Sequence, residues 1–326
     1  MDGKTTLLIT VNNSSMRRYR EDSVYARHLR SEFPKVRFCF MDSNAINSEH
    51  IRHANIIVGH PDPKLLIEAT QLQWLHVMSA GVDAYARPSL YCRRDVIVTR
   101  AIHVHDIPVA EHALGLVLAC MRMIPSAVRL GPASWNDSSY PSRELAGSSV
   151  LLLGAGELAV EIALRLRAFS AHVSTVCLHP DRERVGFEHI YPSSALKTAL
   201  SNSDIVINTL PLTPLTHRIL DKEAFDAMKP NAVFVNVGRG ACVDQSALIS
   251  ALNSGHLSMA ALDVADPEPL PVDCPLWHMD NVLITPHVAG YSDAAEQRKF
   301  KGLQTQLRAF LEGRLLSGRV DLHEGY

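Results

Sequence analysis

The chain has 326 residues, of which 47% are hydrophobic and 20% charged, so it is a folded globular protein long enough for two domains. Its formal net charge of −2, without a dense Lys/Arg block, argues against nucleic acid as the main partner. No apolar run reaches the roughly 18–20 residues of a membrane span, and the N-terminus lacks the order of regions of a signal peptide. The six cysteines form no Cys-x-x-Cys pair, so we expect reduced thiols in a cytoplasmic protein and no metal site.

The first hundred residues predict strands that alternate with helices. Short apolar runs indicate the strands, and amphipathic stretches indicate the helices. Strands are predicted over 7–11, 36–40, 55–58, 72–77 and 96–98, and helices over 19–31 and 63–70. This alternation implies βαβ units on a parallel sheet. The region has no glycine fingerprint, so it is not the obvious cofactor-binding domain.

A long apolar helix is predicted over 109–123, opened by Pro108 and closed before Pro125. We expect this helix to be buried and to link two α/β regions. The Pro/Ser-rich stretch 131–143 that follows is expected to form an irregular arm.

The second α/β region begins at about residue 148 and again alternates strands with helices. Further strands are predicted over 173–178, 205–209, 232–236, 259–263 and 282–285, and helices over 195–201, 222–228, 245–254 and 294–313.

The second region opens on a strand, a glycine turn and a helix. Residues 150–153 form a fully apolar run, and Gly154-Ala-Gly156 follows at once. In a dinucleotide-binding turn, Gly154 would permit the tight bend, Gly156 would let the backbone approach a pyrophosphate, and Ala159 would let the helix pack on the strand. The free N–H groups of the helix would face the phosphates. The pattern therefore predicts dinucleotide binding, although a glycine turn in any α/β protein can look the same.

Three predicted strands are followed by groups suited to redox chemistry on an acid. Arg239, between Gly238 and Gly240, could bind a carboxylate bidentately, and its glycines suggest a tight backbone that aims it. His287 titrates near neutrality and could pass a proton, and a carboxylate such as Glu268 would favour its charged form. Each could also be structural or solvated by itself. Ligands of open α/β sheets bind outside the carboxyl ends of the strands, so together they predict a site there.

The ordered motifs of the chain resemble those of the D-isomer-specific 2-hydroxyacid dehydrogenases over nearly the whole length. The motifs are Ser79-Ala-Gly-Val-Asp83, Val109-Ala-Glu-His112, Leu210-Pro-Leu-Thr-Pro214, Asn236-Val-Gly-Arg-Gly240, Asp263-Val264 with Glu268-Pro-Leu270, Pro275-Leu-Trp277, Asn281-Val-Leu-Ile-Thr-Pro-His287 and Ala289-Gly290. The resemblance implies an α/β fold in which a Rossmann-type nucleotide-binding domain, residues 101–289, is inserted into a flavodoxin-like substrate domain, residues 1–100 and 290–326.

The resemblance also implies catalytic roles. Arg239 would bind the carboxylate and keto oxygen of a 2-oxo acid, and His287 would be the acid/base that Glu268 holds protonated. Backbone N–H groups of Ser79, Ala80 and Gly81 would complete the carboxylate site as a backbone nest. Reduction to the D-2-hydroxy acid would then combine hydride transfer from a nicotinamide with a proton from His287.

A nicotinamide cofactor, NAD or NADP, is implied as well, and Asp263 would contact its carboxamide. The residues that we expect to bind the cofactor are Gly154, Gly156, Glu157, Leu158, His179, Arg182, Leu210, Pro211, Thr216, Val237, Gly238, Asp263 and Gly290.

The chain departs from the pattern at the end of its second nucleotide-domain strand. Family members that prefer NAD usually carry an Asp there for the ribose hydroxyls, but this chain has Cys177. The nearby basic residues His179, Arg182 and Arg184 could meet a 2′-phosphate, so we favour NADPH. The alternative is that these basic residues form a solvated loop, which the acidic residues Asp181 and Glu183 beside them would favour.

Within the family, the chain is most similar to glyoxylate/hydroxypyruvate reductases, and a phosphoglycerate dehydrogenase-like enzyme is the alternative. A nucleotide-sensing protein like the corepressors that share this fold is a second alternative, but the lack of long disordered flanks favours an enzyme. The resemblance implies a homodimer, with the arm at 125–145 as the expected interface. We expect the histidines at 103, 105, 112 and 217 to be structural or exposed.

Overall fold

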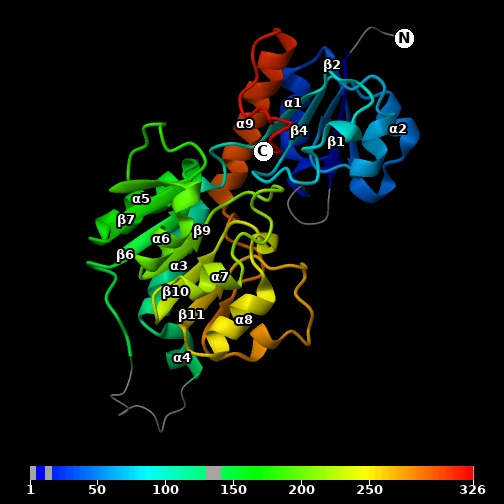
Figure 1. Ribbon diagram of the computed structural model, residues 1–326. Helices are drawn as coiled ribbons and strands as arrows, with labels where there is room; N and C mark the ends of the chain where they lie inside the picture. The colour runs from blue at the N-terminus through cyan, green and yellow to red at the C-terminus, as the bar shows by residue number, and fades with distance from the viewer. Residues whose placement is uncertain (1–4, 12–16, 130–140, 326) are drawn as a thin grey trace. The chain divides into compact units, whose positions relative to one another are not determined.

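The computed structural model describes residues 5–11, 17–129 and 141–325. The chain divides into two compact units, Met1–Val104 with Asp293–Tyr326, and His105–Ser292. Each unit is built on a parallel sheet with helices on both faces (Figure 1). The two parallel sheets, and the place of the second unit between the two chain segments of the first, confirm the predicted α/β fold class, a Rossmann-type domain inserted into a flavodoxin-like one.

The first unit contains a five-stranded parallel sheet in the order β2-β1-β3-β4-β5, the order of flavodoxin-like folds. Its strands are β1 (Thr5–Val11), β2 (Val36–Asp42), β3 (Ile56–Val58), β4 (Trp74–Val77) and β5 (Ile97–Arg100). Its short 3-10 helices are η1 (Arg17–Tyr19), η2 (Ser43–Ala45), η3 (Pro63–Glu68) and η4 (Pro88–Leu90).

Alternate residues of β1 enter two different cores, as strand geometry requires. Leu7 packs on one face with α1 (Val24–Glu32) and α9 (Asp293–Leu311). Leu8 packs on the opposite face with α2 (Ser48–Arg52) and η3. Because both faces are covered, the strand is buried along most of its length and appears in the sequence as a continuous apolar run.

The second unit contains a seven-stranded parallel sheet in the order β12-β11-β10-β9-β6-β7-β8. Its strands are β6 (Ser149–Leu153), β7 (His172–Cys177), β8 (His189–Pro192), β9 (Ile205–Asn208), β10 (Ala232–Asn236), β11 (Leu257–Leu262) and β12 (Val282–Ile284). Numbered within the unit, this is the dinucleotide-binding order 3-2-1-4-5-6 with one further strand. The strand order reverses between β6 and β9, which places the topological switch point there.

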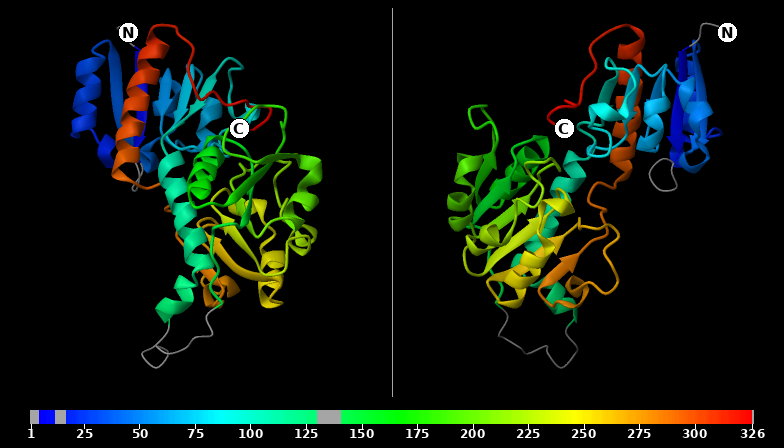
Figure 2. Two further views of the ribbon diagram at one scale, coloured as in Figure 1. Left: turned by 90° about the vertical axis from the view of Figure 1, so that its left-hand side faces the viewer. Right: turned by 45° about the vertical axis from the view of Figure 1, so that its right-hand side comes forward.

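Helices cover both faces of this second sheet (Figure 2). On one face lie α3 (Asp106–Met121) and α5 (Glu157–Ala168), with α4 (Ile124–Arg129) following α3. On the other face lie α6 (Leu196–Ser201), α7 (Lys222–Asp226) and α8 (Gln245–Asn253). Among the described residues of the unit, the 3-10 helices are η6 (Ser193–Ala195), η7 (Gly240–Cys242) and η8 (Pro275–His278).

Local chemistry explains where element boundaries differ from the sequence predictions. The helix predicted from residue 19 begins only at Val24, because the Ser23 side chain accepts a hydrogen bond from the Ala26 N–H and caps it. The predicted helix over 109–123 begins earlier, at Asp106, because Pro108 sits in the first turn, where its missing N–H costs nothing. The edge strand β8 is not predicted because it is only four residues long, has no fully buried residue and ends in proline.

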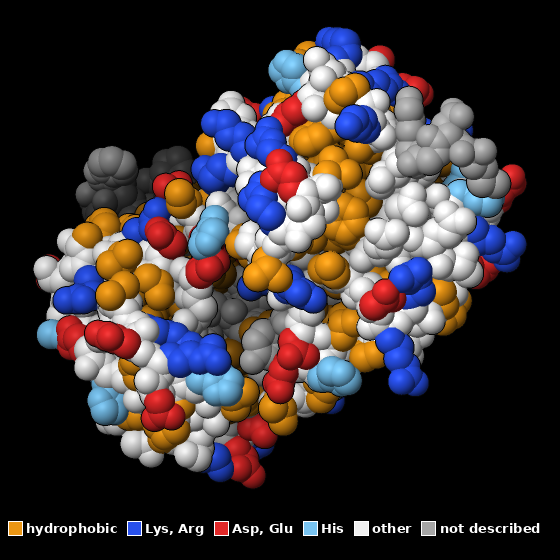
Figure 3. Space-filling view, turned by 90° about the horizontal axis from the view of Figure 1, so that it is seen from above, with side chains coloured by type: hydrophobic (Ala, Val, Ile, Leu, Met, Phe, Trp, Pro, Cys, Tyr) orange, Lys and Arg blue, Asp and Glu red, His pale blue; other side chains and the backbone are white. Residues whose placement is uncertain are grey.

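The predicted arm at 131–143 lies mostly outside the described residues. None of the described helices is long and apolar enough to cross a membrane. On the face drawn in Figure 3, Lys and Arg side chains are interspersed with Asp and Glu.

Candidate active site

The predicted site residues of the second unit follow the carboxyl ends of its strands. Gly154 follows β6, Leu210 follows β9, Arg239 follows β10 and His287 follows β12. Because all strands run parallel, these segments share one edge of the sheet. Ligands of open α/β sheets bind at this edge, next to the switch point.

The glycine loop has the geometry that a pyrophosphate requires. Gly154 has a φ of +96°, a conformation that favours glycine. A Cβ there would come within 3.1 Å of Thr209 Oγ1, so the loop packs closely on the segment after β9. Gly156 is the N-cap of α5, and a Cβ on it would project into open space. The N-terminal end of α5 thus faces a space that glycine leaves open, which fits a dinucleotide phosphate.

The two glycines around Arg239 are required by close backbone packing. A Cβ on Gly238 would lie 2.9 Å from the backbone N and O of Leu210, and one on Gly240 would lie 1.9 Å from the Ala265 carbonyl oxygen. The Arg239 segment is therefore wedged between the loops that follow β9 and β11. Its half-buried guanidinium donates from Nη1 to Gly238 O at 2.7 Å. This packing fixes the backbone that carries Arg239 at this edge of the sheet.

Glu268 and His287 form a direct hydrogen bond. His287 Nδ1 lies 2.7 Å from Glu268 Oε2, and Glu268 Oε1 accepts the Ala265 N–H at 3.0 Å. Because a carboxylate only accepts, Nδ1 carries a proton, which leaves Nε2 as the ring atom able to exchange one. The two side chains are 54% and 40% exposed, so a substrate could reach the imidazole.

Asp263, predicted to contact the nicotinamide carboxamide, is 3% exposed and fastens the turn that carries His287. Its Oδ1 accepts from Thr285 Oγ1 at 2.6 Å and from the Val288 N–H at 3.0 Å. Its Oδ2 accepts from the Ala289 N–H at 3.1 Å. The carboxamide contact stays a prediction. No role is predicted for Thr285 from the sequence, and its place two residues before His287 is the signal that could indicate one.

Three other residues that are predicted to bind the cofactor make hydrogen bonds within the loops at this edge of the sheet. Thr216 Oγ1 donates to Pro211 O at 2.6 Å, and the Val237 N–H donates to Asn208 O at 3.1 Å. Gly290 O lies 3.1 Å from His105 Nδ1. Glu157 and Leu158 begin α5 directly after the glycine turn.

At the end of β7, where the sequence has Cys177 and no carboxylate, the nearest charged side chain given by the structure is a cation. Cys177 is buried, and Arg184 Nη1 lies 3.2 Å from its sulfur. His179 and Arg182 are exposed in the same loop. The positive charge next to the strand end therefore comes from Arg184.

Ser79, Ala80 and Gly81 lie in the first unit, after β4. The Ser79 hydroxyl donates to Gly81 O at 2.7 Å, so His60 Nε2, 3.1 Å from Ser79 Oγ, must be the donor in that contact. Burial, together with Lys299, lowers the pKa of His60 to about 4, so the ring is neutral at physiological pH. Substrate binding by these three residues stays a prediction.

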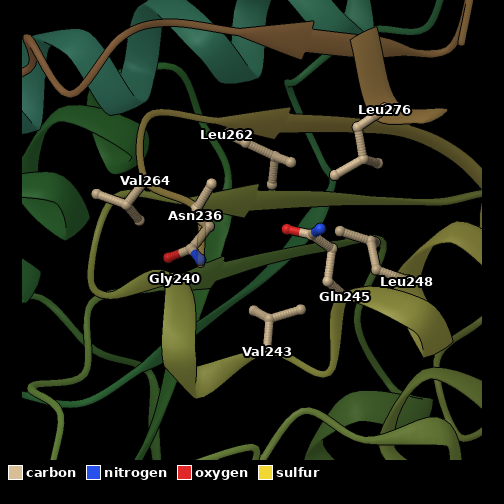
Figure 4. Close-up of a pocket in the computed structure, with 9 residues that line it drawn as sticks. Asn236, Gly240, Val243, Gln245, Leu248, Leu262, Val264 and Leu276 are labelled. Atoms are coloured by element: carbon tan, nitrogen blue, oxygen red, sulfur yellow. The ribbon is translucent and has the colours of Figure 1, made fainter. Parts of the chain in front are cut away.

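A small cavity lies beside the Gly240 backbone, and Figure 4 shows the Asn236 and Gln245 side chains among its lining. Its volume of about 10 Å³ holds roughly one water molecule. Ligand sites span several hundred cubic ångströms, so this cavity is not the substrate site.

Comparison with known proteins gives concordant findings. A family model described as D-isomer specific 2-hydroxyacid dehydrogenase, NAD binding domain, matches residues 114–289. A glyoxylate reductase from Thermofilum pendens is 35% identical over 263 residues, which cover 78% of this chain and 76% of that protein.

Two further relatives extend the comparison. A D-3-phosphoglycerate dehydrogenase from Mycobacterium tuberculosis is 32% identical over 81% of this chain, but the match covers only 50% of that protein. The crystal structure of a D-isomer specific 2-hydroxyacid dehydrogenase from Xanthobacter autotrophicus, in complex with NADPH and MES, superposes with a TM-score of 0.83 at 29% identity. That match covers 99% of this chain and 100% of the other.

Proposed function

Because the chain belongs to the D-isomer specific 2-hydroxyacid dehydrogenase family, we propose that it reduces a 2-oxo acid to the D-2-hydroxy acid with a nicotinamide cofactor. The observation that carries this proposal is the 2.7 Å hydrogen bond between His287 and Glu268, at the sheet edge that also carries Arg239. An acid/base imidazole and a guanidinium are the two protein groups that such a reduction needs.

In the proposed reaction, Arg239 binds the substrate and His287 transfers a proton to it. The Arg239 guanidinium binds the substrate carboxylate as a planar fork and stabilises negative charge that develops on the keto oxygen. His287 donates the Nε2 proton to that oxygen, while Glu268 accepts from Nδ1 and stabilises the imidazolium. The nicotinamide, when bound, supplies the hydride. Ser79, Ala80 and Gly81 remain predicted ligands of the carboxylate.

We propose glyoxylate or hydroxypyruvate as the substrate class and NADPH as the preferred cofactor. The 35% identity to a glyoxylate reductase supports the substrate class. The Arg184 guanidinium beside Cys177 supports the cofactor, because a cation at the end of β7 can neutralise a 2′-phosphate. The similarity to phosphoglycerate dehydrogenases favours 3-phosphoglycerate, oxidised in the reverse direction, as the second candidate.

Steady-state oxidation of NADPH and NADH against glyoxylate, hydroxypyruvate, pyruvate and phenylpyruvate tests these proposals together. We expect the highest kcat/KM with a small acid and NADPH. A parallel assay gives the protein 3-phosphoglycerate with NAD+ or NADP+, and turnover there without reduction of any of the four acids would replace the substrate proposal. A clear preference for NADH would end the cofactor proposal. Tight cofactor binding without turnover of any acid would instead favour a nucleotide sensor.

We also propose a homodimer that uses the arm at 125–145. Light scattering on purified protein should give the dimer mass, and a stable monomer would contradict it.

A further inference from the structure

Helix α3 presents two histidines to the turn that carries His287. His105 is the N-cap residue of α3, and His112 follows seven positions later. With 3.6 residues per turn, that spacing puts both on the same side of the helix. His105 Nδ1 lies 3.1 Å from Gly290 O, and His112 Nε2 lies 3.0 Å from Thr285 Oγ1.

The direction of each hydrogen bond follows from its partners. Gly290 O can only accept, so His105 Nδ1 donates. Thr285 gives its single hydroxyl proton to the buried Asp263 carboxylate at 2.6 Å, so its oxygen accepts from His112 Nε2. Both imidazoles are donors, and both contacts persist whether the rings are neutral or charged.

The two contacts bracket His287. Thr285 precedes it by two residues and Gly290 follows it by three. His287 itself has a φ of +52°, a backbone conformation that side-chain-bearing residues rarely adopt and that surrounding contacts must maintain. Asp263 supplies contacts from the sheet, and α3 supplies the two from its histidines.

The position of α3 does not depend on these histidines. Its apolar residues, among them Ala113, Leu116 and Val117, pack in a core with α5 and the sheet. Loss of one imidazole would therefore leave the helix in place and release the turn.

We propose that His105 and His112 are positioning residues, a two-point clamp by which α3 fixes the turn at 285–290 and hence the His287 imidazole. The kinetic consequence rests on the proposed function, whereas the clamp itself rests on the hydrogen bonds. From the sequence, both histidines are expected only to be structural or exposed.

Paired substitutions separate the hydrogen bond from general packing. His112→Leu removes the donor, whereas His112→Gln keeps an N–H near the Nε2 position. His105→Leu and His105→Asn form the corresponding pair for Nδ1. His256→Leu is the matched control, because His256 Nε2 also contacts a backbone carbonyl, Phe225 O, in the same unit but away from the turn.

Two readouts are compared across these variants. Hydrogen–deuterium exchange should show the Val288 and Ala289 amides exchanging at least about 10-fold faster in the two leucine variants. The reason is that the hydrogen bonds from these two N–H groups to the Asp263 carboxylate then break more often. In kinetics, kcat should fall by about 10- to 100-fold, with KM for the acid and Kd for the cofactor changed less than about 2-fold. His112→Gln and His105→Asn should recover most of both losses, and His256→Leu should behave as wild type.

The results distinguish failure of the clamp from failure of the proposed function. Unchanged exchange at 285–290 in both leucine variants overturns the clamp, whatever the turnover. Equal losses in the leucine and amide variants also overturn it, because the hydrogen bond would then not be what matters. If the wild type reduces no 2-oxo acid but exchange responds as expected, the proposed function fails and the clamp stands.

Discussion

Gly240→Ala is expected to destabilise the protein because the new Cβ would lie 1.9 Å from Ala265 O and 2.0 Å from Ala265 C. Ordinary contact begins near 3.4 Å, so the loops after β10 and β11 would have to separate by roughly 1.5 Å. Both partners are backbone atoms that cannot rotate away. A cost of about 3 kcal/mol follows, which for a unit of this size lowers Tm by about 6–12 °C.

Gly156→Ala is the matched control for this substitution. Nothing lies within 4 Å of its added Cβ, so we expect a stability change below about 1 kcal/mol. The same Cβ would occupy the space in front of α5, so cofactor Kd should rise at least about 10-fold. Thermal unfolding by circular dichroism and a cofactor fluorescence titration measure the two effects. A Gly240→Ala protein that melts within about 1 °C of wild type would refute the close packing at Arg239.

Three other substitutions test separate groups. Arg239→Lys keeps the positive charge but loses the planar guanidinium fork, so kcat/KM for the 2-oxo acid should fall by about 10²–10³-fold while cofactor Kd is unchanged. Activity equal to that of the wild type would show that Arg239 does not bind the substrate. Arg184→Ala should raise KM for NADPH more than for NADH, and parallel changes would separate Arg184 from the 2′-phosphate. The pKa of His60 is lowered to about 4 in the folded state, so between pH about 6.5 and 4 the unfolded chain binds a proton that the folded chain does not, and stability falls as pH falls. His60→Gln retains a donor for Ser79 without titrating, so urea midpoints should show a shallower acid loss than in wild type, and an unchanged slope would contradict the assignment.

Most strands can be predicted because strands buried on both faces appear in the sequence as continuous apolar runs. Val150 to Leu153 is apolar throughout, and every residue of that run is buried. The edge strand β8 was missed because only its pairing with β7 makes it a strand. Its residues are half exposed or exposed and carry no apolar pattern.

The candidate site was predictable to the level of residue type and strand end. The glycines around Arg239 indicated a tight backbone, but its partners, Leu210 and Ala265, come from other loops and required the structure. The seven-residue spacing of His105 and His112 is visible in the sequence. Their targets, Thr285 and Gly290, are more than 170 positions away, beyond the reach of any local pattern.

The most direct test of the account follows the hydride. Purified enzyme is given glyoxylate with nicotinamide cofactor deuterated at the transferring carbon, and separately a larger 2-oxo acid whose product is chiral. We predict that deuterium appears at C2 of the hydroxy acid and that the chiral product is the D-isomer. An L-product, or cofactor oxidation without label at C2, would contradict the proposed reduction.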